Sequence, residues 1–223
     1  MTKKTGKTHR ITEVDIIKEF GSICACNSTL AFSQMIDRAI DLEVPDLKVV
    51  KFKNINQVIK NKEDNIVIGV HCQILSGILG QVSLLFKEKS AFEFVSLFAT
   101  KKKHSIGFLT QLGVSTIKEI GNVVVSAYTG AISLLMDVPV IPSIPVLSSG
   151  PLKEVIRFGM VNFHDEDNVY LHTMTFRDLD RKISGSFYLV LTPDTVRQVT
   201  EVMRKHLKSV QELKDKAKGI KIR

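Results

Sequence analysis

Residues 115–145 read STIKEIGNVVVSAYTGAISLLMDVPVIPSIP, and this stretch decides the fold because a similar one precedes it by 100 residues. The earlier stretch, residues 15–45, reads DIIKEFGSICACNSTLAFSQMIDRAIDLEVP. In both stretches the apolar residues recur with the period of a helix, and proline follows. We therefore predict two long helices at equivalent places in two similar halves. The aligned polar and proline positions are Asp15 with Ser115, Glu19 with Glu119, Ser22 with Asn122, and Pro45 with Pro145.

The segments around these helices repeat in the same order. Alternating apolar residues predict antiparallel strands in each half, and a helix follows them. The run GQVSLLF that begins at Gly80 matches the run GSFYLVL that begins at Gly185. The expected strands cover residues 47–53, 65–75, 79–87, 168–177 and 184–192. The expected helices cover residues 12 to about 40, 89–100, 106–136, 151–159 and 193 to about 208.

A fold built from these parts is α+β, with two layers, an antiparallel sheet, two long helices and an internal duplication with pseudo-twofold symmetry. Each half is too short to bury a large core alone, so we expect one body over residues 12–205. Its two repeats would cover residues 12–105 and 106–205. Basic tails are expected at residues 1–11 and 206–223.

The formal charge of +8 belongs to the ends of the chain. Residues 1–11 carry +4 and residues 204–223 carry +6, which leaves −2 for the body. The body shows no basic face with interleaved aromatic residues of the kind that binds nucleic-acid strands. Nucleic acid is therefore not an expected partner, and a nucleic-acid or membrane-surface role would rest on the two tails alone.

Other classes of protein lack their sequence signals here. Cys24, Cys26 and Cys72 have no CxxC spacing, so we expect reduced thiols and no metal site. The longest uncharged stretch, Ile120–Met136, contains polar residues and is short for a membrane span. No apolar signal peptide follows the basic N-terminus. We therefore expect a cytoplasmic protein without membrane insertion.

The second long helix has two different faces when its residues are placed at 100° intervals. The expected core face carries Ile117, Ile120, Val124, Ala127, Ala131 and Leu135. The opposite face, which we call the polar stripe, carries Ser115, Glu119, Asn122, Ser126, Thr129 and Ser133. Glu119 and Asn122 are three residues apart, so their side chains stand next to each other. A polar face is most often simply solvated, but this one lacks the Lys and Glu pairs of a solubilising surface, which suggests docking.

The pattern Ser115-x3-Glu119-x2-Asn122-x22-Pro145 resembles the Asp/Ser-x3-Glu-x2-Asn-x22-Pro signature of the CheC, CheX and FliY phosphatases. The resemblance covers residues 12–205, because CheC-like proteins are themselves duplicated and carry one signature in each half. It implies a phosphatase that removes the phosphoryl group from the aspartyl phosphate of a CheY-type chemotaxis response regulator.

The resemblance also implies a mechanism in which the helix enters the regulator's active site. Glu119 would pair with a lysine of the regulator, and Asn122 would orient the attacking water through its carboxamide. Phosphoryl transfer depends largely on positioning and charge neutralisation, and the regulator supplies its own Mg²⁺ and lysine. No cofactor, metal or nucleophile is therefore expected from this chain.

The first half departs from the signature at one position. The pattern Asp15-x3-Glu19-x2-Ser22-x22-Pro45 keeps the spacing but has serine in place of asparagine. Because a hydroxyl does not reach as far as a carboxamide, we predict that this site is weak or silent. Two interpretations stay open: Glu19 still supports docking, or the first helix is purely structural.

Two further alternatives follow from the family. CheC proteins also bind the deamidase CheD through the segment after the second signature, here SSGPLKEVIRFG at residues 148–159. Pro151 and Lys153 differ from the small, apolar helix of the family, so CheD stays an open partner. The main rival to the phosphatase hypothesis is a non-catalytic binding module like the middle domain of the flagellar switch protein FliM, which shares the architecture and lacks the Glu and Asn.

Overall fold

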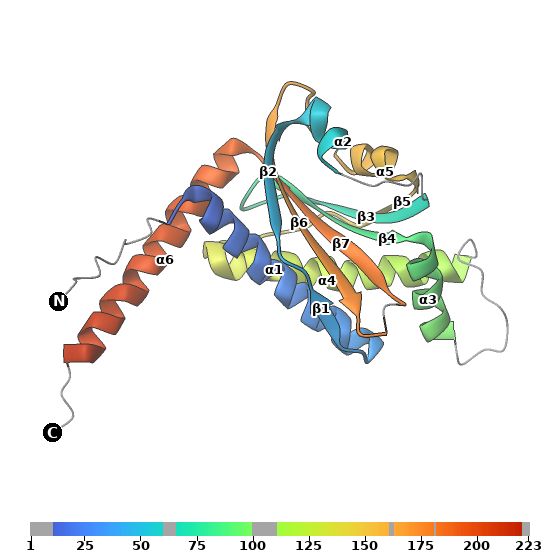
Figure 1. Ribbon diagram of the computed structural model, residues 1–223, viewed down its shortest axis with the longest axis horizontal. Helices are drawn as coiled ribbons and strands as arrows, with labels where there is room; N and C mark the ends of the chain where they lie inside the picture. The colour runs from blue at the N-terminus through green and yellow to red at the C-terminus, as the bar shows by residue number, and fades with distance from the viewer. Residues whose placement is uncertain (1–10, 60–65, 100–110, 161–162, 181, 220–223) are drawn as a thin grey trace, which may run out of the picture.

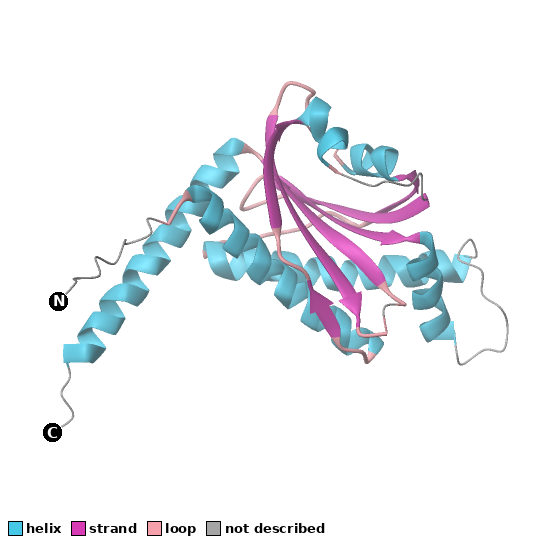
Figure 2. Cartoon of the chain, in the orientation of Figure 1, coloured by secondary structure: helices cyan, strands magenta, loops and turns pink. Residues whose placement is uncertain are grey.

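The computed structural model describes residues 11–59, 66–99, 111–160, 163–180 and 182–219. Helices flank a twisted antiparallel sheet (Figures 1 and 2). The helices are α1 (Glu13–Ile36), η1 (Phe52–Asn54), α2 (Ile55–Val58), α3 (Glu88–Ala99), α4 (Gln111–Met136), α5 (Leu152–Gly159) and α6 (Pro193–Gly219). The strands are β1 (Ile40–Leu42), β2 (Asp46–Lys51), β3 (Ile66–Ile74), β4 (Gly80–Lys87), β5 (Val146–Pro151), β6 (Asn168–Asp178) and β7 (Ser184–Leu191).

The two long helices that the repeat predicts are α1 and α4, and their C-terminal ends are built alike. Asp37 and Asp137, directly after each helix, both adopt the left-handed conformation, with φ of 51° and 58°. In each helix the serine four residues earlier closes the turn, because Ser33 Oγ donates to Arg38 O at 2.5 Å and Ser133 Oγ donates to Val138 O at 2.6 Å. In return, Arg38 N donates to Ser33 O at 3.2 Å and Val138 N donates to Ser133 O at 3.3 Å, so a carbonyl group that each helix end would otherwise leave unpaired is satisfied.

The start of α1 is also fixed by its own residues. Thr12 and Asp15 form a reciprocal cap, in which Thr12 N donates to Asp15 Oδ2 at 2.9 Å and Asp15 N donates to Thr12 Oγ1 at 3.2 Å. The cap satisfies two backbone donors of the first turn. The start predicted from the sequence is therefore confirmed.

Within the described ranges, seven strands form one antiparallel sheet in the order β1-β6-β7-β4-β3-β5, with β2 also paired to β6. The strand that follows each long helix crosses to the other half, since β2 pairs with β6 and β5 pairs with β3. The strands β1 and β5 were not predicted from the sequence. Both lie in proline-bearing segments, and proline is tolerated there because these strands lie at sheet edges.

The two faces of the sheet bury different cores. Alternate residues of β7 show the division, since Phe187 and Leu189 belong to the core under α1 and α4, while Tyr188 and Val190 belong to a smaller core under α2 and α5. Figure 1 shows α1 and α4 on one side of the sheet and α2 and α5 on the other. The expected mixed helical and antiparallel architecture is confirmed, with short helices over part of the second face.

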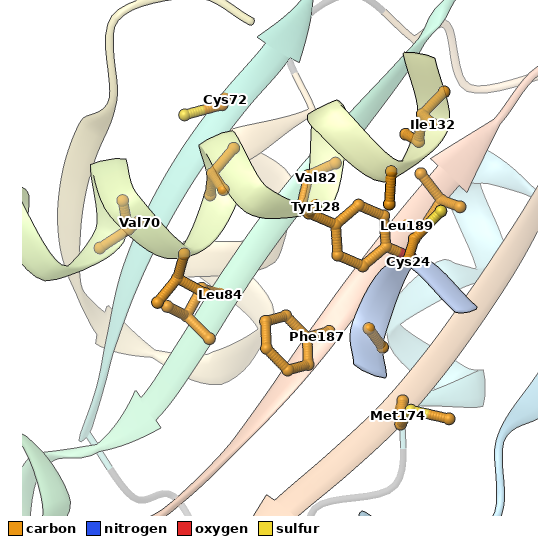
Figure 3. Close-up of a cluster of buried hydrophobic side chains, with 14 of the residues drawn as sticks. Cys24, Val70, Cys72, Val82, Leu84, Tyr128, Ile132, Met174, Phe187 and Leu189 are labelled. Carbon is orange, nitrogen blue, oxygen red and sulfur yellow. The ribbon is translucent and has the colours of Figure 1, made fainter. Parts of the chain in front are cut away.

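Tyr128 joins the two long helices above the sheet. The centroid of its ring lies 5.9 Å from that of Phe187 (Figure 3). Its hydroxyl donates to Gly21 O of α1 at 3.4 Å. Burial among these groups raises the pKa of Tyr128 well above its usual value. Tyr128 thus connects α4 to α1 and to β7, and these contacts fix the position of α4 on the sheet.

Gly121 lets α4 approach β3 closely, and this gives a stability prediction. A methyl group at Gly121 would overlap the side chain of Val70, whereas nothing lies within 4 Å of the position that it would take at Gly130. We expect Gly121→Ala to lower the free energy of unfolding by about 1–3 kcal/mol through overpacking. Gly130→Ala, the matched control in the same helix, should raise it by about 0.5–1 kcal/mol. Urea unfolding of both variants measures the difference, and equal stabilities would contradict this account of the packing.

One helix has the length and apolar composition of a membrane span. Among the described helices this is Gly113–Met136 of α4, with a mean hydropathy of 1.3, but half of its most apolar part is buried inside the protein.

The last helix, α6, runs to Gly219 and so extends well beyond the predicted end near residue 208. Residues 1–10 of the predicted N-terminal tail lie outside the described ranges.

Candidate functional site

Glu119 and Asn122 both lie on the exposed side of α4. Ile117 and Ile120, on the opposite side of the same turns, are buried in the larger core, with at most 2% of their surface exposed. Burial of this apolar side fixes which way α4 faces, because rotating the helix would expose it. Within the described part of the chain, neither Glu119 nor Asn122 makes a side-chain hydrogen bond or ion pair. A carboxylate and a carboxamide are thus presented together without partners of their own.

The polar stripe is narrower than the sequence predicts. Ser115 and Ser126 are exposed as expected, but Thr129 is only 2% exposed, and its hydroxyl donates to Val125 O at 3.0 Å. Ser133 is half-buried because its hydroxyl closes the end of the helix. A position on a helical projection does not say where a neighbouring helix packs, and α1 lies along this helix. The expectation of exposure was therefore wrong for Thr129 and only partly met for Ser133.

The exposed side of α4 also carries apolar residues that were not predicted from the sequence to lie there. Val123 is 37% exposed and lies one turn after Glu119, and Leu134 is 80% exposed near the end of the helix. Both are within 115–145, and their helical positions could have identified them. Val123 therefore places an apolar side chain beside Glu119, whereas Leu134 lies about three turns further along α4.

Pro145 lies outside α4, directly before β5. The segment that returns from α4 is held to the end of β3, since Ser143 N donates to Gln73 O and Leu75 N donates to Ile141 O, both at 2.8 Å. Proline without an N–H suits the start of this edge strand. The structure therefore gives Pro145 a place in the turn to β5, and Pro45 occupies the same place before β2.

The corresponding residues of the first half are arranged differently. Asp15 takes part in the N-terminal cap of α1, and Ser22 is half-buried with its hydroxyl donating to Lys18 O at 2.6 Å. Glu19 is exposed. The helix α1 thus presents a carboxylate without the adjacent amide that α4 provides.

The support beneath the two helices also differs. Under Gly121 of α4 lies Val70, but under Gly21 of α1 lies His172, and a Cβ at Gly21 would meet that ring at 2.7 Å. Burial lowers the pKa of His172 to about 4, so the ring is neutral at physiological pH.

A second buried histidine, His71 of β3, is held by hydrogen bonds. Burial lowers its pKa to about 4, and its ring nitrogens bond to Ser83 Oγ and Ser148 Oγ at 2.9 and 2.8 Å.

Within the described residues, no group of three or more His, Cys, Asp or Glu side chains is placed to hold a metal ion. The described cysteines Cys24, Cys26 and Cys72 are free thiols.

Comparisons with known proteins point to one group. No family model matches the chain. The CheY-P phosphatase CheC of Bacillus subtilis (strain 168) is 25% identical over 186 residues, which cover 82% of this chain and 88% of that protein. The crystal structure of Thermotoga maritima FliY is similar with a TM-score of 0.66 and 19% identity, covering 86% of this chain and 96% of that one.

A second solved structure shares the same fold. The FliM middle domain from H. pylori superimposes with a TM-score of 0.60 at 9% identity, covering 86% of this chain and 98% of that one. At such low identity the likeness shows the fold alone. The sequence match to CheC covers most of both chains, and the fold is shared with FliY and CheX, so the proteins that this chain resembles are the chemotaxis proteins CheC, CheX and FliY.

Proposed function

We propose that the protein hydrolyses the aspartyl phosphate of a CheY-type response regulator by inserting Glu119 and Asn122 of α4 into the regulator's active site. The single observation that carries the proposal is the exposed, unpartnered pair of side chains on one face of a helix whose other face is buried. The name of the B. subtilis relative, a CheY-P phosphatase, supports the same reaction class.

Each residue of the pair has a separate task in this proposal. The carboxamide of Asn122 can donate and accept a hydrogen bond at once, so it can hold a water in line with the phosphorus atom. The carboxylate of Glu119 would pair with a lysine of the regulator and set the docking register. Because the regulator contributes Mg²⁺ and the phosphorylated aspartate, the protein needs no cofactor of its own. A cytoplasmic location, where such regulators act, is part of the proposal.

Dephosphorylation of a phosphorylated regulator tests the proposal directly. The protein would be added at one-tenth of the regulator concentration, and the remaining aspartyl phosphate would be followed over time against a reaction without it. A catalyst removes many equivalents of phosphate per molecule. Loss of no more than the spontaneous amount with several candidate regulators would reject a phosphatase function.

The first-half residues give a prediction in the same assay. We expect Glu19→Ala to change the rate of dephosphorylation by less than about twofold, because α1 lacks the amide that orients water. Glu119→Ala is the matched variant on α4, and we expect it to raise the regulator concentration needed for half-maximal rate by about tenfold or more through loss of a charged contact. A large effect of Glu19→Ala would show that the first half is an active site as well.

A second candidate function is a non-catalytic module that binds a response regulator or a flagellar-switch protein. The observation that favours it is the fold shared with the FliM middle domain. Binding of a phosphorylated regulator without any acceleration of phosphate loss would support this function.

A deamidase of the CheD type, the other partner implied by the resemblance, would bind at α5, where Lys153, Glu154 and Arg157 are exposed.

A further inference from the structure

A cavity of about 580 Å³ lies on the sheet face opposite α1 and α4. Residues at the end of α2 and the start of α5 line it, together with residues of the strands β2, β3, β4, β6 and β7. Its floor includes Leu85, Leu171 and Tyr188, which belong to the smaller core and not to the core beneath α4. This volume is in the range of sites that bind small molecules.

One end of the cavity is polar and positively charged. Arg177 of β6 is the register partner of Ser184 of β7, and Lys87 follows the residue of β4 that pairs with Gly185. Two cations from neighbouring strands therefore flank the start of β7 on both sides. One row further along the sheet, the hydroxyls of Thr175 and Ser186 lie 3.3 Å apart.

The other end of the cavity is aliphatic. Ser186 is the register partner of Leu85, so the apolar floor begins next to the hydroxyl row. The floor continues to Leu171, and the walls come from the two short helices, with Val58 and Ile59 at the end of α2 and Leu152 at the start of α5. Charged, hydroxyl and aliphatic groups thus follow one another along a single hollow.

The cations of the cavity are not all neutralised. Lys48 pairs with Asp46 at 2.9 Å, and Arg177 pairs with Glu43. Lys87 makes no side-chain hydrogen bond or ion pair among the residues that the structure describes. A lysine without an ionic partner, beside a row of hydroxyl groups, favours an anion at this end.

We propose that this cavity binds an amphiphilic anion, a small molecule with a carboxylate, sulfonate or phosphate head and an apolar body. The head would lie between Lys87 and Arg177 and accept hydrogen bonds from Ser186 and Thr175. The apolar body would cover Leu85 and extend toward the two short helices. The site is separate from Glu119 and Asn122, because those residues lie on a helix that packs on the other face of the sheet.

Titration of the full chain with 8-anilinonaphthalene-1-sulfonate at pH 7.5, followed by fluorescence, tests the site, and decanoate and decanol serve as competing ligands. We expect saturable binding of one probe per chain, displaced by decanoate and at least about tenfold less well by decanol, because the head forms charged hydrogen bonds. Lys87→Glu should weaken binding at least about tenfold. Lys89→Glu, the same charge change at an exposed residue of α3 outside the cavity, should change it less than about twofold.

A cavity-filling variant separates the site from general surface binding. Ser186→Phe places a ring in the hollow and should abolish saturable binding, while the near-ultraviolet circular dichroism and the unfolding midpoint show that the fold is kept. The proposal is overturned if binding is not saturable, if Lys87→Glu behaves like Lys89→Glu, or if decanol competes as well as decanoate. Dephosphorylation by Lys87→Glu should equal that of the wild type, so this result is independent of the proposed phosphatase activity.

Discussion

Asn122→Ala is expected to slow dephosphorylation of the response regulator by at least about 100-fold, which is the usual effect of removing a group that positions a reactant. The side chain is exposed and has no partner within the described chain, so the substitution should leave the fold intact. Regulator binding should survive, since Glu119 and the apolar residues of the same face remain. The measurement is the initial rate at saturating regulator, with binding measured separately by titration of the regulator held in a beryllium fluoride complex.

Ser126→Ala is the matched control for this experiment. Ser126 is exposed on the same face, one turn after Asn122, and it is not part of the signature. We expect its rate to stay within about twofold of the wild type, as is usual for an exposed position without a special contact. If Asn122→Ala retained the wild-type rate, the water would have to be oriented by another group, and the proposed mechanism would be wrong.

Acidification should cost the protein roughly 4 kcal/mol of stability between pH 7.5 and pH 5, about 2 kcal/mol from each of His71 and His172. Burial lowers the pKa of both imidazoles to about 4, from a usual value of 6.5. Above pH 6.5 the folded and unfolded states both hold neutral rings, so stability does not change. As the pH falls toward 4, only the unfolded chain takes up these protons, and the free energy of unfolding declines. Below pH 4 both states are protonated and this contribution levels off.

Urea unfolding at a series of pH values measures this decline, and a substitution assigns it. His172→Leu should remove about half of the pH dependence and cost less at pH 7.5 than the same change at His71, because the ring of His172 interacts with the backbone of Lys18 but forms no hydrogen bond of normal geometry within the described chain. His71→Leu should be more costly at pH 7.5, since that ring bonds to Ser83 and Ser148. An unchanged pH profile in both variants would assign the decline to carboxylates instead.

Much of the helical structure was predictable because its determinants are local. The caps of α1, the apolar stripe of α4 and the shared C-terminal ends depend on residues within one or two turns of each other. The strands β3, β4, β6 and β7 were expected within two residues of their observed ends, because their residues alternate between two buried faces. The internal duplication itself stays a prediction from the sequence repeat.

The missed elements have non-local causes. β1 and β5 are short or proline-bearing edge strands whose identity comes from a partner strand in the other half of the chain. Thr129 is buried in the folded protein, although its place on the helical projection predicts exposure. The cavity near Lys87 is assembled from strands far apart in the sequence, so no local pattern could have revealed it.

The sequence by itself determined that Glu119 and Asn122 stand side by side on the outward side of a helix, because a spacing of three residues and an apolar stripe are properties of one segment. Only the tertiary structure decided that Ser126 is exposed on this side of the helix while Thr129 is buried. It alone also decided that a cavity with Lys87 and Arg177 in its lining lies on the other face of the sheet. The physical reason is that burial depends on which element packs against a residue, and that choice is made by the whole chain.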